Sequence, residues 1–222
     1  MKYWYLAALS VVLGILLAVV EKKQKFKAAL AVKTLASAAF VALGILSYLT
    51  RPEPAGILIL IGLVLGAVGD VLLNIRHLKN GNLVFFYIGG VSFFFGHLLY
   101  LAAFIPFAAP HLPAAIVFGI AFAAAITLAE FSFTRGTGMM RIAGAVYILT
   151  VSLMASVAVF AAIRQRFALP FLLRAIGGCL FLISDSALFF RMMKNESGTV
   201  LAFLVLLTYY PAQCLIAASM AF

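Results

Sequence analysis

The amino-acid sequence predicts an all-α, polytopic integral membrane protein, built as a bundle of eight transmembrane helices. Hydrophobic residues make up 66% of the 222 residues and charged residues only 10%, whereas a soluble domain keeps roughly a quarter of its residues charged. The apolar residues form runs of about 20, the length that a helix needs to cross a bilayer. Pro, Gly or charged residues separate the runs. Open sheet edges cannot face lipid, so the runs are expected to be helices.

Each predicted span is bounded by residues that interrupt an apolar helix. The first, residues 3–20, follows Lys2 and ends at the basic stretch EKKQKFK. It lacks a small-x-small cleavage site, so we expect a retained helix and not a signal peptide. The second, residues 28–49, ends at RPEPAG, where two prolines break the helix. The third, residues 55–75, ends at RHLKNGN, and the fourth, residues 83–105, ends at PFAAPHLP.

The second half of the chain repeats this alternation. Spans at residues 114–133, 142–163 and 170–190 end at TRGTGMMR, RQRFA and RMMKNESG, and the last span covers residues 199–219. No joint is long enough for a separate domain, so residues 1–222 are expected to form a single transmembrane domain. The third and seventh spans both place an aspartate six residues before an arginine. This would suit a 4+4 repeat, although the two halves are otherwise dissimilar.

Basic residues give the chain a formal charge of +10. They lie between the apolar runs, as in the loops of a membrane protein, so we expect no nucleic-acid partner. Ten Lys and Arg residues fall in the first, third, fifth and seventh joints, against four on the other side. The positive-inside rule then places those four joints in the cytoplasm and both termini outside. The sequence leaves the oligomeric state open.

Metal and cofactor chemistry has little support in the sequence. A zinc site needs about three His or Cys ligands close together. His77 and His111 fall in joints on opposite sides, and only His97 lies within a span. Cys179 and Cys214 are isolated in apolar runs, and neither a GxSxG elbow nor a Gly-rich phosphate loop is present. We therefore expect no metal and no cofactor.

The only two aspartates of the chain, Asp70 and Asp185, both lie inside predicted spans. A charge at the bilayer centre costs about 2.5–3.5 kcal/mol on insertion scales, so such residues face the bundle interior and usually have a function. Each stands six residues before an arginine at the predicted cytoplasmic end, which is roughly 9 Å along a helix axis. We expect both carboxyl groups at one depth, in the cytoplasmic half of the bundle.

Other polar residues lie within the spans near the same depth. Gly62, Gly66 and Asp70 share one helical stripe that admits a close neighbouring helix. Ser184 and Ser186 flank Asp185 and are possible hydrogen-bond donors to it. The remaining candidates are Lys33, His97, Tyr100, Tyr147, Tyr209 and Gln213. Simpler roles stay open for some of these residues, since a lysine can extend to the membrane surface and His97 or the tyrosines can serve as packing residues.

Two carboxyl groups in an apolar cavity suit acid and base chemistry. Burial and mutual repulsion favour the neutral form of one, while a cation such as Lys33 keeps the other ionised. Glycosidases use such a pair to protonate a leaving group and to stabilise an oxocarbenium ion. We therefore expect Asp70 and Asp185 to be the catalytic acid and base, in either order.

Four stretches occur together and in a fixed order: GDVLL in the third span, FFGHLLY in the fourth, LFLISDSAL in the seventh and TYYPAQ in the eighth. Jointly they resemble the YhhN-like lysoplasmalogenase family of multi-span membrane proteins, and the resemblance extends from Lys33 to Gln213. Thr34 departs from it, because many members have proline after the lysine. The resemblance implies hydrolysis of the vinyl ether bond of a lysoplasmalogen to a fatty aldehyde and glycerophosphoethanolamine or glycerophosphocholine.

On this resemblance the protein would act on a lysophospholipid within membrane lipid, in the cell (inner) membrane of a bacterium. The scissile bond lies just beneath the headgroup, near the expected depth of the aspartates. The cavity would be lined by His97, Tyr100, Tyr147, Tyr209 and Gln213, and the phosphate would be held by Arg76, Lys79, Arg191 and Lys194. Two alternatives stay open: a proton-coupled transporter of a small or lipid-like substrate, whose relays also use intramembrane carboxylates, and a lipid-binding protein without chemistry.

Overall fold

The structure, a computed structural model, describes residues 3–79, 81–133, 138–193 and 199–222. These ranges contain no strand and eight long helices, each long and apolar enough to cross a membrane. The predicted all-α architecture is therefore confirmed. The helices are α1 (Trp4–Lys22), α2 (Phe26–Thr50), α3 (Pro54–Leu78), α4 (Leu83–Ala108), α5 (Leu112–Phe133), α6 (Gly138–Arg164), α7 (Leu169–Met193) and α8 (Thr199–Ala218), followed by a short 3₁₀ turn, η1 (Ser219–Ala221).

Several helices extend past the predicted apolar spans, by up to four residues. The added residues at the ends of α1, α3 and α7 include Lys22, Arg76 and Arg191. Basic side chains stabilise the last turn of a helix because they complement its dipole. α4 continues through Pro106, and Arg164 donates hydrogen bonds to the carbonyl oxygens of Pro106 and Phe107 at 3.4 and 3.3 Å. Polar residues at the helix ends therefore lengthen the helices beyond what hydropathy alone predicts.

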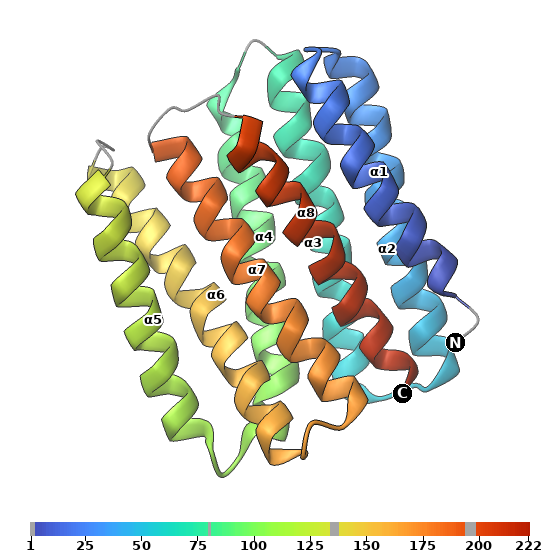
Figure 1. Cartoon of the computed structure of the whole chain (residues 1–222), viewed down its shortest axis with the longest axis vertical. Helices are drawn as coiled ribbons and strands as arrows, with labels where there is room; N and C mark the ends of the chain where they lie inside the picture. Colours follow the sequence, from blue (N-terminus) through green and yellow to red (C-terminus); the bar gives the residue numbers. More distant parts are fainter. Residues whose placement is uncertain (1–2, 80, 134–137, 194–198) are drawn as a thin grey trace.

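The helices run side by side, with α1 and α5 at opposite edges of the bundle (Figure 1). α3, α4, α7 and α8 occupy the middle, and α5 packs chiefly on α6. The α1–α2 connection, with Lys22 and Lys23, lies at one end, which we name the predicted cytoplasmic end. Both chain termini lie toward the opposite end, here named the terminal end. An even number of described spans places the two termini on the same side.

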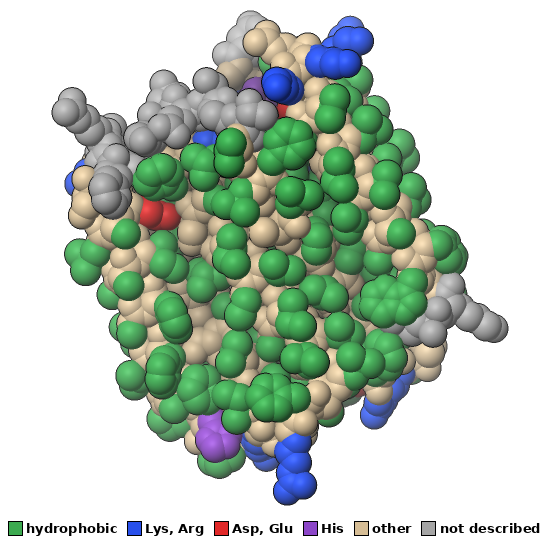
Figure 2. All heavy atoms as spheres, in the orientation of Figure 1, with side chains coloured by type: hydrophobic (Ala, Val, Ile, Leu, Met, Phe, Trp, Pro, Cys, Tyr) green, Lys and Arg blue, Asp and Glu red, His purple; other side chains and the backbone are tan. Residues whose placement is uncertain are grey.

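Hydrophobic side chains cover the middle of the molecular surface, and the visible Lys and Arg side chains gather at its two ends (Figure 2). Large apolar residues that would be buried in a soluble protein are exposed along the helices, among them Val12, Leu35, Val117 and Leu128. Alanines and glycines fill many of the contacts between helices, which lets the backbones approach closely, as is common in membrane bundles. The polar site described next lies inside this apolar belt.

Candidate active site

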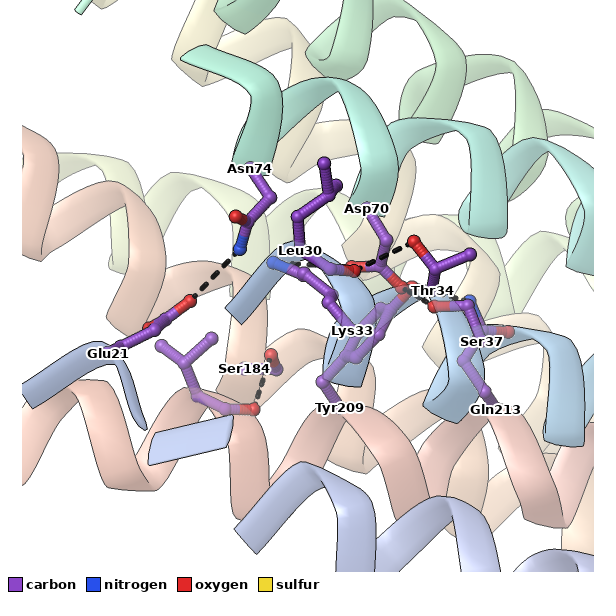
Figure 3. Close-up of polar contacts among 11 residues, drawn as sticks. Glu21, Leu30, Lys33, Thr34, Ser37, Asp70, Asn74, Ser184, Tyr209 and Gln213 are labelled. Carbon is purple, nitrogen blue, oxygen red and sulfur yellow. Dashed lines mark hydrogen bonds and ion pairs between the residues drawn. The ribbon is translucent and has the colours of Figure 1, made fainter. Parts of the chain in front are cut away.

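Asp70 lies on α3 with only 2% of its surface exposed. The ammonium group of Lys33 lies 3.5 Å from Asp70 Oδ1. The hydroxyl groups of Ser37 and Tyr209 donate hydrogen bonds to Oδ2 at 2.6 and 2.8 Å. Lys33 and Ser37 are one turn apart on α2, and Tyr209 comes from α8 (Figure 3). Two helices, α2 and α8, thus place donors on both oxygens of one buried carboxyl group of α3.

A chain of hydrogen bonds continues from Asp70 to α4. Gln213 Nε2 donates to the Tyr209 hydroxyl at 3.1 Å, and the Tyr100 hydroxyl donates to Gln213 Oε1 at 2.8 Å. The two glycines of α3 make room for this chain. A Cβ atom at Gly66 would lie 2.4 Å from Gln213 Nε2, and one at Gly62 would lie 2.5 Å from the Tyr100 ring. The expected small-residue stripe therefore brings α4 and α8 against α3.

Asp185 lies on α7, is 6% exposed, and has its own partners on α4 and α6. The Tyr147 hydroxyl donates to Asp185 Oδ2 at 2.8 Å. His97 Nε2 lies 3.0 Å from the same oxygen and 3.2 Å from the Tyr147 hydroxyl. The other ring nitrogen of His97, Nδ1, is buried and has no hydrogen-bond partner among the described residues. Tyr147 and His97, both singled out from the sequence, thus converge on the second aspartate.

The flanking serines do not donate hydrogen bonds to Asp185, which corrects the interpretation of the sequence. The Ser184 hydroxyl donates to the carbonyl oxygen of Val205 at 3.2 Å, and the Ser186 hydroxyl is buried without a partner in the part of the chain that the structure describes. Residues adjacent in sequence point to different faces of a helix, so neither flanking serine reaches the carboxyl group. The donors come from other helices instead.

An aromatic side chain stands between the two aspartate clusters. The ring of Phe181 lies 4.8 Å from the His97 ring, 6.1 Å from the Tyr100 ring and 5.6 Å from the Tyr209 ring, measured between centroids. No hydrogen bond between the described residues joins one cluster to the other. The gap between them is too narrow to hold a water molecule, and it is lined by Gly62, Gly66, Phe93, Gly96, His97, Tyr100, Phe181 and Gln213. Neither Asp70 nor Asp185 lines this gap, and a closed gap separates the two clusters in place of the open shared cavity that we expected.

Polar side chains continue from Asp70 toward the predicted cytoplasmic end. Asn74 lies one turn after Asp70 and donates to Glu21 Oε1 at 3.5 Å (Figure 3). Beyond it, Glu21, Arg76, Lys33 and Arg191 all act electrostatically on His77. The predicted phosphate-binding residues Arg76 and Arg191 thus both act on one imidazole at this end of the bundle. Lys79 is exposed just after α3, and Lys194 lies outside the described residues.

Three polar residues of the interior were missed from the sequence. Ser37 and Asn74 stand four residues after Lys33 and Asp70, so the helical period could have found both. Arg174, a charged residue inside α7, could have been found as an intramembrane cation. The departure at Thr34 leaves the Lys33–Asp70 contact in place, because the Thr34 hydroxyl bonds the Leu30 carbonyl of its own helix at 2.8 Å. Among the described residues, no three His, Cys, Asp or Glu side chains gather closely enough to hold a metal ion.

Comparison with known sequences agrees with the resemblance carried by the motifs. The family model described as the YhhN family matches residues 28–220, which include every helix that contributes to the two aspartate clusters. Comparisons with curated proteins and with solved structures found no match. Because the match covers most of the chain, this protein belongs to the YhhN family, the family of lysoplasmalogenases.

Proposed function

We propose that this protein is a membrane hydrolase that cleaves the vinyl ether bond of a lysoplasmalogen, using Asp70 and Asp185 as its acid and base. Membership of the YhhN family supports a lysoplasmalogenase type of activity. The observation that carries the aspartate mechanism is the convergence of side chains from four helices, α2, α4, α6 and α8, on two buried carboxyl groups of α3 and α7. Buried polar groups of this kind are costly in a membrane protein and are commonly functional.

The reaction needs an acid and a water molecule. A proton adds to the vinyl carbon that does not carry oxygen, and the oxygen-bearing carbon becomes an oxocarbenium ion. Water adds to that carbon and loses a proton, giving a hemiacetal. The hemiacetal hydroxyl then loses its proton as the bond from carbon to the glycerol oxygen breaks, and the glycerol oxygen gains a proton. These steps release the fatty aldehyde and the glycerophospho-alcohol. A positioned acid and an ionised base speed such proton transfers, typically by 10²–10⁴-fold.

Asp70 suits the role of the ionised partner. A carboxylate accepts hydrogen bonds through both oxygens. Asp70 forms an ion pair with Lys33 at Oδ1 and accepts hydrogen bonds from two hydroxyl groups at Oδ2. A negative charge held in this way stabilises the positive charge that develops on the oxocarbenium carbon. The same carboxylate can take a proton from the attacking water.

Asp185 suits the role of the acid. No Lys or Arg forms an ion pair with it among the described residues, and its partners are the Tyr147 hydroxyl and the His97 ring. His97 Nε2 and Asp185 Oδ2 are close enough to share one proton. In this proposal Asp185 gives the proton to the vinyl carbon and His97 restores it, while the unpartnered Nδ1 of His97 provides a second site for proton exchange.

The gap must open before a lipid can bind. It has no room for a water molecule, so we propose that the substrate chain displaces the Phe181 ring, which separates the clusters. The headgroup phosphate would then lie at the predicted cytoplasmic end, against Arg76 and Arg191. In this proposal the vinyl ether group, which begins at the glycerol oxygen, would lie between the two aspartate clusters.

The test measures aldehyde release from a lysoplasmalogen by the purified protein in detergent or nanodiscs. Asp70→Asn and Asp185→Asn should each lower kcat by about 10²–10⁴-fold, the usual contribution of an acid or base. Glu130→Gln is the matched control, because it makes the same carboxyl-to-amide change at a buried residue of α5, away from the gap. Gel filtration and thermal unfolding establish that each variant is folded.

The outcomes separate the candidate functions. Folded aspartate variants with wild-type turnover would exclude the mechanism. No aldehyde from the wild-type protein, together with substrate accumulation in proteoliposomes under a pH gradient, would favour the proton-coupled transporter. Binding of the lipid without chemical change by both the wild-type protein and the asparagine variants would favour a lipid-binding protein.

A further inference from the structure

A second polar cavity lies at the terminal end of the bundle, opposite the basic residues near His77. It has a volume of about 130 Å³ and is lined by Arg51, Glu53, Phe107, Pro170, Phe171, Arg174, Ser219, Met220 and Phe222. A cavity needs only about 10–15 Å³ of such space to hold one water molecule. It is therefore large enough for a small polyatomic ligand. None of its lining residues belongs to the gap between the aspartates.

Arg174 is the charged residue around which this cavity is built. It is 3% exposed, and its side chain is enclosed by Phe104, Phe107 and Phe171, whose ring centroids lie 5.3–5.9 Å from the guanidinium carbon. Nε donates to the Ser219 hydroxyl at 3.1 Å, and Nη2 donates to Glu53 Oε1. Nη1 is buried without a partner among the described residues. A guanidinium group held rigidly with one unused donor is suited to binding an oxyanion.

The charges around the cavity also favour an anion. Arg51 and Arg174 both line it and repel each other electrostatically, while Glu53 is the one acidic side chain among its described lining residues. Glu53 already accepts a hydrogen bond from Arg174, and its side chain is 28% exposed. Placing two arginines against a single carboxylate leaves one positive charge without a counter-charge among the lining side chains. An anion between Arg51 and Arg174 would relieve their repulsion.

We propose that this cavity is a binding site for a phosphate group, supplied by the headgroup of an anionic lipid or by a soluble phosphate. Arg174 would bind the phosphate oxygens through Nη1, Arg51 would close the outer side, and the Ser219 hydroxyl would orient the guanidinium group. A hydrogen bond from a charged guanidinium group to a phosphate oxygen is stronger than one between neutral groups. The site lies at the other end of the bundle from the proposed catalytic residues and does not depend on them.

The experiment compares two probes on the intact purified protein. Inorganic phosphate is titrated against chloride at matched ionic strength, with thermal unfolding as the measurement. Phosphatidylglycerol is compared with phosphatidylcholine by native mass spectrometry of bound lipid. Binding of inorganic phosphate identifies a site open to soluble phosphate, and binding of phosphatidylglycerol alone identifies a lipid headgroup site.

Three arginine variants decide whether the cavity is responsible. Arg174→Gln should weaken binding of the effective probe by about tenfold or more, because it removes a charge-assisted hydrogen bond. Arg51→Gln should weaken binding of the same probe several-fold. Because Arg51 is exposed and takes no part in the buried hydrogen bonds, this variant keeps the test decisive if Arg174→Gln does not fold. Arg166→Gln, an exposed arginine at the same end but outside the cavity, is the control and should bind as the wild type does. Failure of both probes to bind above their controls, or equal binding by the wild type and Arg51→Gln, would show that the cavity holds only water and would overturn the proposal.

Discussion

Asp70 differs from Asp185 in having a lysine partner, because Lys33 forms an ion pair with the Asp70 carboxyl group. Breaking a buried ion pair costs about 3–5 kcal/mol, since one charge is left without its partner. We expect Lys33→Met to unfold at a lower temperature and to lose about tenfold or more in kcat/KM, because Asp70 then takes up a proton at neutral pH. Raising the pH should restore part of the activity, since Asp70 ionises again. Lys27→Met, at an exposed lysine of the same helix, should change neither property.

Tyr209 and Tyr210 form a matched pair for testing the hydrogen-bond chain. The Tyr209 hydroxyl donates to Asp70 and accepts from Gln213. The Tyr210 hydroxyl lies near Ser37 but has no hydrogen bond of ordinary geometry among the described residues. A typical hydrogen bond contributes about 0.5–1.5 kcal/mol, and one to a charged group about 1.5–3 kcal/mol. Tyr209→Phe should therefore destabilise the protein by about 2 kcal/mol and lower turnover. Tyr210→Phe should leave stability and turnover unchanged. Thermal unfolding and the aldehyde assay measure these two properties. Equal effects of the two changes would contradict the hydrogen-bond chain.

At the scale of helices, the contact between α3 and α8 depends on Gly66. A Cβ atom there would lie 2.4 Å from Gln213 Nε2, so the amide must move and its hydrogen bonds to Tyr209 and Tyr100 must break. Gly66→Ala should cost about 1–3 kcal/mol, the usual range for overpacking, and should lower activity. Gly90→Ala on α4 is the control, because a Cβ atom at Gly90 meets nothing within 4 Å. Thermal unfolding and turnover of the two variants test this, and a folded Gly66→Ala variant with full activity would show that Gln213 is not needed.

Helices were easier to predict from the sequence than the contacts between them. Apolar runs and their polar ends fixed all eight spans to within four residues, because the bilayer imposes length and composition on each helix separately. The partners of Asp185 could not be assigned in this way, since His97 and Tyr147 lie on other helices and one sequence does not say which helices touch. Proximity in sequence wrongly suggests Ser184 and Ser186 as donors to Asp185, because adjacent residues of a helix point in different directions. The apolar residues around Arg174 predict a membrane span regardless of this one charge, so the pattern of hydropathy does not single it out.

Across the whole molecule, the two aspartate clusters use equivalent helices of the two halves. Asp70 on α3 has partners on α2 and α8, and Asp185 on α7 has partners on α6 and α4. If each helix of the first half is matched with the helix four places later, α3 corresponds to α7 and α2 to α6. In the same way α4 corresponds to α8, so the partner helix of one aspartate matches that of the other. This correspondence is what a 4+4 repeat would produce, with an axis along the bundle. Such a repeat would put both carboxyl groups at one depth, as their equal spacing from Arg76 and Arg191 predicts, although only Asp70 has a lysine partner.

The orientation of the whole bundle remains a prediction of its charge distribution. Ten basic residues in the odd-numbered joints against four on the other side should place those joints in the cytoplasm and both termini outside. Single cysteines at Gln24 and Ala168, exposed positions at opposite ends that leave every charge in place, can report this after Cys179 and Cys214 are changed to Ala. A membrane-impermeant maleimide should label Ala168→Cys in intact cells and Gln24→Cys only after permeabilisation. The reverse pattern would put the proposed headgroup site on the outer surface, and the lipid would then have to reach the aspartates from the outer leaflet.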